Sequence, residues 1–63
     1  MNKIKHFREK QNMSQEQLAQ KSGVSRQTIS ALENNENYDV RIGTMVSIAD
    51  ALGKKVQDIF FPK

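Results

Sequence analysis

The sequence predicts an all-α fold in which five short helices pack around one core. Apolar residues recur at helical spacing in five segments, and no segment alternates polar and apolar residues as a strand would. Gly23 and Gly53 each follow a helical pattern, as expected of residues that end helices. Because 63 residues leave room for one core, we expect a single domain over residues 1–63.

Composition restricts the function classes before any motif is considered. Ten Lys plus Arg against seven Asp plus Glu give a net charge of +3, which favours polyanionic partners. With no cysteine, one histidine and no glycine-rich phosphate loop, we expect no enzyme, no metal and no cofactor. No stretch has the apolar length of a membrane span, so we expect a soluble, cytoplasmic protein with no membrane partner.

The first helix should contain Ile4 and Phe7, which lie three residues apart among charged residues. It should end near Asn12, because asparagine readily adopts the left-handed conformation of a helix C-terminus. Ser14 and Gln17 have the spacing of a capping box, in which each side chain binds the other residue's backbone N–H. A second helix is therefore predicted to start at that serine.

The second and third helices are separated by very few residues. Gly23 can adopt a left-handed conformation at no steric cost, Val24 fills the corner, and Ser25 caps the third helix. At about 100° per residue, the third helix places Ile29 and Leu32 on one side. Its other side carries Gln27, Ser30, Ala31 and Asn34.

Two further helices are expected after a polar loop. The fourth has apolar residues at helical spacing and ends at Gly53; the series is Ile42, Met45, Ile48, Ala49 and Leu52. Residues 56–61 form a short fifth helix that Pro62 stops. Phe60 should complete the core, whereas Phe61 should be exposed.

Two helices joined by a short turn that contains glycine form a helix-turn-helix unit, here over about residues 14–34. The second helix of such a unit enters the DNA major groove, and the first braces it. A rigid brace requires a short turn, which explains why so little chain separates the two helices. The alternative is a generic helical bundle that contains a glycine turn.

The stretch "SQEQLAQKSGVSRQTISALEN", followed later by "IADALG" and "DIFF", resembles the Cro and phage-repressor type of helix-turn-helix, the xenobiotic-response-element family. The resemblance covers nearly the whole chain and implies a compact, five-helix, lambda-repressor-like DNA-binding domain. The sequence departs from the family's pattern in three places. Asn35 replaces the usual glycine after "LEN", and the loop "NENYDVRI" is one residue longer than the commonest pattern, which affects the register of Tyr38 and Arg41. Lys54 and Lys55 replace an apolar residue and a capping serine.

The resemblance implies DNA contacts on the second helix, the third helix and the following loop. Arginine suits the O6 and N7 acceptors of guanine, glutamine suits adenine, and an alanine methyl packs on thymine. The implied base readers are Arg26, Gln27, Ser30 and Ala31. The implied backbone contacts are Gln15, Ser25, Thr28, Asn34, Tyr38 and Arg41. For Arg26 the alternatives are a phosphate contact or a solvated side chain.

The resemblance also implies a structural role for two charged residues. Arg8 of the first helix and Glu33 of "LEN" match a buried ion pair that ties the first helix to the third. Loss of one partner would leave a buried charge unpaired, so mutation of either residue should affect folding before it affects DNA specificity.

Together these features predict a sequence-specific DNA-binding transcriptional regulator, a repressor that binds a pseudo-palindromic operator as a homodimer. One recognition helix reads only a few base pairs, so useful specificity requires two copies. The candidate dimer residues are Val56, Ile59 and Phe61, unless the dimer forms only on DNA. The alternative function is an antitoxin-type module whose main partner is a protein; it predicts a large apolar surface.

Overall fold

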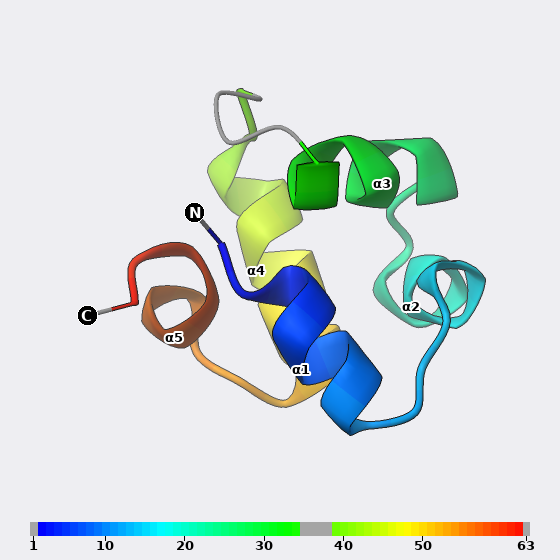
Figure 1. Cartoon of the computed structure of the whole chain (residues 1–63). Helices are drawn as coiled ribbons and strands as arrows, with labels where there is room; N and C mark the ends of the chain where they lie inside the picture. The colour runs from blue at the N-terminus through cyan, green and yellow to red at the C-terminus, as the bar shows by residue number, and fades with distance from the viewer. Residues whose placement is uncertain (1, 35–38, 63) are drawn as a thin grey trace.

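The computed structural model describes residues 2–34 and 39–62, which form five helices and no strand. In chain order these are α1 (Ile4–Lys10), α2 (Gln15–Ser22), α3 (Arg26–Asn34), α4 (Ile42–Leu52) and α5 (Val56–Phe60). Figure 1 shows α4 running through the middle, with α2 on one side and α5 on the other. The predicted all-α class is confirmed. Asn35 and Tyr38 lie outside the described residues.

The ends of α1 are held by long-range hydrogen bonds as well as by local ones. Asn12 adopts a φ of 55°, the left-handed conformation predicted for the end of this helix. At the other end, Asn2 Oδ1 accepts the Ile4 N–H at 3.1 Å while its amide donates to the Leu32 carbonyl at 2.7 Å. The start of α1 is thereby tied to α3.

Both ends of α2 have the predicted local structure. Ser14 Oγ accepts the Gln17 N–H at 3.0 Å, and Gln17 Oε1 accepts the Ser14 N–H at 2.8 Å, which completes the capping box. Gly23 has a φ of 75°, and its N–H donates to the Ala19 carbonyl at 2.9 Å. Ser25 Oγ then accepts the backbone N–H of the third residue of α3. The short connection between α2 and α3 is therefore explained by one cap and one left-handed glycine.

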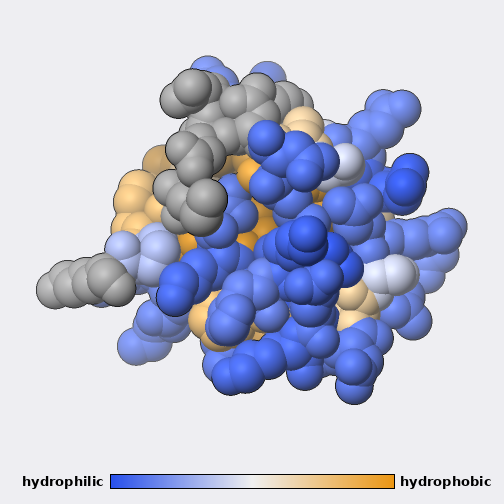
Figure 2. Space-filling view, in the orientation of Figure 1, coloured by the Kyte–Doolittle hydropathy of each residue, from blue (hydrophilic) through white to orange (hydrophobic). Residues whose placement is uncertain are grey.

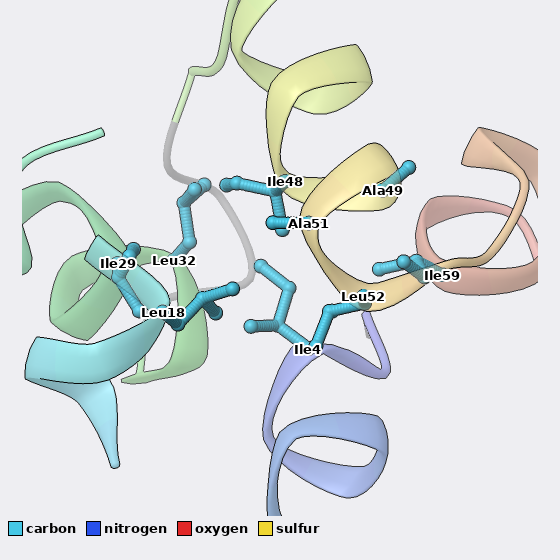
Figure 3. Packing of buried hydrophobic residues seen from close by; sticks show 9 residues of the cluster. All are labelled: Ile4, Leu18, Ile29, Leu32, Ile48, Ala49, Ala51, Leu52 and Ile59. Carbon is cyan, nitrogen blue, oxygen red and sulfur yellow. The ribbon is translucent and has the colours of Figure 1, made fainter. Parts of the chain in front are cut away.

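The core draws side chains from all five helices, and these point toward one another in Figure 3. Its members are Ile4, Leu18, Ile29, Leu32, Ile48, Ala49, Ala51, Leu52 and Ile59. Phe60 packs against this cluster and Phe61 is exposed, as predicted.

The N-terminal half of α4 departs from the simple apolar series. Met45 is only half-buried, and Ile42 is 76% exposed. At about 100° per residue, Ile42 lies roughly 120° around the helix from Ile48 and on the same side as Val46, which is also exposed. The spacing is thus helical, but the core covers only one side of this part of the helix.

The environment of α5 corrects one expectation about the dimer. Ile59 is fully buried within a single chain, and Val56 is half-buried against the same core. A side chain with no exposed surface cannot contact a second copy, so the assignment of Ile59 to a dimer interface is wrong. Asp58, the third residue of α5, accepts the Lys55 N–H at 3.3 Å, the contact that the third residue of a helix makes in a capping box. No described helix has the length and apolarity needed to cross a membrane.

Candidate nucleic-acid interface

The α2–α3 unit presents α3 at the surface while the rest of the domain holds it in place. Ile29 and Leu32 bury the inner side of α3 against the core, and Leu18 does the same for α2. Because α2 packs against both α3 and α4, it braces α3 on the body of the protein. Figure 1 shows this unit on the opposite side of the molecule from α5.

The outer side of α3 carries the residues predicted to read bases. Arg26 and Gln27 are exposed in the first turn, and Asn34 is exposed at the end. Ser30 and Ala31 between them are half-buried, and the Asn34 amide donates to Ser30 Oγ at 3.3 Å. Hydrophilic residues cover most of the side of the molecule that α2 and α3 occupy (Figure 2). The structure thus brings these residues onto one polar face of a braced helix.

Two of the predicted backbone contacts form a local pair at the start of α3. Ser25 Oγ donates to Thr28 Oγ1 at 2.8 Å and accepts the Thr28 N–H at 3.1 Å. Thr28 also lines a shallow recess with Arg41 and Thr44, which joins the first turn of α3 to the start of α4. Thr44 was not among the predicted residues. It lies one helical turn after Arg41 at the start of α4, and this spacing could have identified it as a neighbour of the predicted backbone contact.

An ion pair connects α1 with α3 behind this face. Arg8 Nε donates to Glu33 Oε2 at 2.8 Å, and Arg8 Nη2 donates to Glu33 Oε1 at 3.1 Å. Arg8 Nη1 donates to the Met13 carbonyl at 2.8 Å, so all three guanidinium nitrogens are used. The hydrogen bond to Glu33 raises the pKa of Arg8 above its ordinary value, more than burial lowers it, and the charges of Glu33 and Glu9 act in the same direction.

Gln15, predicted to contact phosphate, joins this ion pair. Its Nε2 donates to Glu33 Oε1 at 3.1 Å, which is the oxygen that Arg8 Nη2 also approaches. The carboxylate therefore links a residue of α1, its own helix α3 and the first residue of α2.

Each arginine of this face shares a recess with an acidic residue, Arg26 with Glu16 and Arg41 with Asp39. Within residues 2–34 and 39–62, Arg8 and Glu33 form the single ion pair, so neither Arg26 nor Arg41 is paired with a described carboxylate. The same residues contain no group of three His, Asp or Glu side chains placed to hold a metal ion.

Known proteins match nearly all of this chain. A family model described as helix-turn-helix matches residues 4–59. The chain belongs to the helix-turn-helix family, of the Cro and xenobiotic-response-element type. An uncharacterized HTH-type transcriptional regulator from Methanocaldococcus jannaschii is 48% identical over 59 residues, or 94% of this chain and 88% of that protein.

Similar relatives occur in other archaea and in bacteria. An uncharacterized HTH-type transcriptional regulator from Archaeoglobus fulgidus is 43% identical, over 92% of this chain and 80% of its own length. The uncharacterized HTH-type transcriptional regulator YgzD of Bacillus subtilis is 35% identical, over 95% and 89% respectively. The family of this helix-turn-helix protein is thus one of DNA-binding transcriptional regulators.

Proposed function

We propose that this helix-turn-helix protein is a sequence-specific repressor that binds a pseudo-palindromic operator as a homodimer. The observation that carries the proposal is the outer face of α3, where Arg26 and Gln27 are exposed on a helix whose opposite side is buried. A helix of this kind fits a major groove about 12 Å wide. The proposed role requires no catalysis, cofactor or metal.

Base reading is assigned to the exposed face, and backbone contacts to the residues around it. Arg26 has the donor geometry for guanine and Gln27 for adenine, with Ser30 and Ala31 beside them. We assign phosphate contacts to Ser25, Thr28, Asn34, Gln15 and Arg41. Tyr38 stays in this group as a prediction from the family resemblance.

The homodimer follows from the small number of bases that one α3 can contact. Two copies would place their recognition helices in successive major grooves, about 34 Å apart along the duplex. Val56 and Phe61 are the remaining candidates for the contact between copies; Phe61 is 62% exposed. Repression is the simplest result of such binding, since a protein on the operator excludes other proteins from the same DNA.

The experiment that tests the proposal is selection of bound duplexes from a random DNA pool, followed by affinity measurements at near-physiological salt. We expect an inverted repeat bound at least about 1,000-fold more tightly than a scrambled duplex. Affinity should also fall steeply with salt, because phosphate contacts release counterions. No enriched sequence and a flat salt response would refute the proposal and direct the search toward a protein partner, as for an antitoxin.

Repression itself requires a separate measurement. A reporter promoter that overlaps the selected inverted repeat should be silenced when the protein is expressed, and a promoter with a scrambled repeat should not. Increased transcription from the first promoter would instead identify an activator, while leaving DNA recognition intact.

A further inference from the structure

The side chain of Gln15 is anchored before any ligand is present. Its Nε2 lies 3.1 Å from Glu33 Oε1, and the Glu33 side chain is only 2% exposed. The carboxylate is itself fixed by the two hydrogen bonds from Arg8. Gln15 thus begins α2 with its amide hydrogen-bonded to a buried, immobilised charge.

We infer that Glu33 is a positioning residue for DNA binding, which acts through Gln15 without touching the DNA. The inference rests on the proposed function and deepens it. A primary amide has two N–H donors, and the contact with Glu33 uses one of them. The second N–H remains to donate to a phosphate oxygen while the first holds the amide in orientation.

The physical basis is preorganisation. A free glutamine side chain is among the most flexible, and fixing it when DNA binds opposes binding. Here Glu33 restricts the side chain in the folded protein, so that less freedom remains to be lost in the complex. The ion pair between α1 and α3 thereby acts on affinity as well as on folding.

The first test needs no DNA and no mutation of the ion pair. In NMR relaxation of the side-chain amides, Gln15 should be more ordered than Gln20, an exposed residue of the same helix. Equal disorder of the two amides would overturn the inference. The relaxation measurement tests whether Glu33 orders the Gln15 side chain even if the protein binds no duplex. Failure to bind any duplex would refute the proposed function but not this ordering.

The second test is a double-mutant cycle on the selected duplex. We expect Gln15→Ala to weaken binding about tenfold, the effect of one charge-assisted hydrogen bond, and Gln20→Ala to serve as the unaffected control. Glu33→Gln should weaken binding about three- to tenfold in the native background but less than twofold when Gln15→Ala is already present. A purely structural Glu33 predicts the same factor in both backgrounds.

Circular dichroism at the binding temperature verifies that each variant is folded. If Glu33→Gln is unfolded, Glu33→Asp takes its place, since it keeps the charge for Arg8 and withdraws the carboxylate from Gln15 by one methylene. Equal factors in both backgrounds, or no effect of Gln15→Ala in a protein that still binds the duplex, would overturn the inference and leave the proposed function standing.

Discussion

Substitution of Arg8 by methionine should remove most of the stability of this domain. The guanidinium makes two hydrogen bonds to Glu33 and one to the Met13 carbonyl, all of which the variant loses. Of its side-chain hydrogen bonds to residues 2–34 and 39–62, the Glu33 carboxylate, 2% exposed, would keep only the one from Gln15. Breaking one side of a buried pair costs about 3 to 5 kcal/mol. A domain of 63 residues has about 3 to 9 kcal/mol in total.

The assay is equilibrium denaturation in urea followed by far-ultraviolet circular dichroism. Lys5→Met, an exposed cation of the same helix, is the matched control and should change the free energy of unfolding by less than about 0.5 kcal/mol. The double variant Arg8→Met, Glu33→Met should recover much of the loss, because no buried charge is left unpaired. A cost below about 1 kcal/mol for Arg8→Met would refute the reasoning.

Because the pKa of Arg8 is raised, the contribution of this arginine to folding stability should not change with pH near neutrality. Because the pKa is raised in the folded protein, the stability that Arg8 contributes is fully present below the pKa of the unfolded chain. It is lost only as the pH rises through the still higher pKa of the folded state.

Four further substitutions test the turn, the cap and the base reading. Gly23→Ala should lower the free energy of unfolding by about 1 to 2 kcal/mol. The cost comes from the φ of 75° alone, since nothing lies within 4 Å of the added carbon. Gly43→Ala, within α4, should instead raise the free energy of unfolding by about 0.4 to 1 kcal/mol, and equal effects of the two substitutions in urea denaturation would contradict this. Ser14→Ala should cost about 0.5 to 2 kcal/mol by removing half of the capping box, and an unchanged thermal midpoint would count against it. Arg26→Ala should lose about 1 to 3 kcal/mol of binding and relax one base position in a repeated selection; uniform weakening on all sequences would assign Arg26 to phosphate.

Local sequence rules sufficed for the helix ends and the helix-turn-helix unit. Ser14, Gln17, Gly23 and Asn12 act on backbone groups within a few residues, so their roles follow from spacing and conformational preference alone. The inner positions Ile29 and Leu32 followed from the helical period in the same way. The outer face of α3 could therefore be identified before the structure was known, although its contacts with DNA remain predictions.

Several features depended on residues far apart in the chain. The Gln11 amide donates to the Leu52 carbonyl at 2.8 Å, a contact across 41 positions that no local pattern indicates. The burial of Ile59 and the exposure of Ile42 were equally hidden, since both residues belong to regular apolar spacings. Spacing shows which residues share a side of a helix, but only the packing of the other helices decides which side is covered.

The sequence by itself determined the helices, their caps, the left-handed turn and the family, because each depends on neighbouring residues or on a contiguous motif. Only the tertiary structure decided what Gln15 and Glu33 do to each other. Their 3.1 Å contact requires α2 and α3 to pack at one particular angle, with Arg8 of a third helix holding the carboxylate between them. Such a contact depends on three helices at once, and no pattern along one helix encodes it.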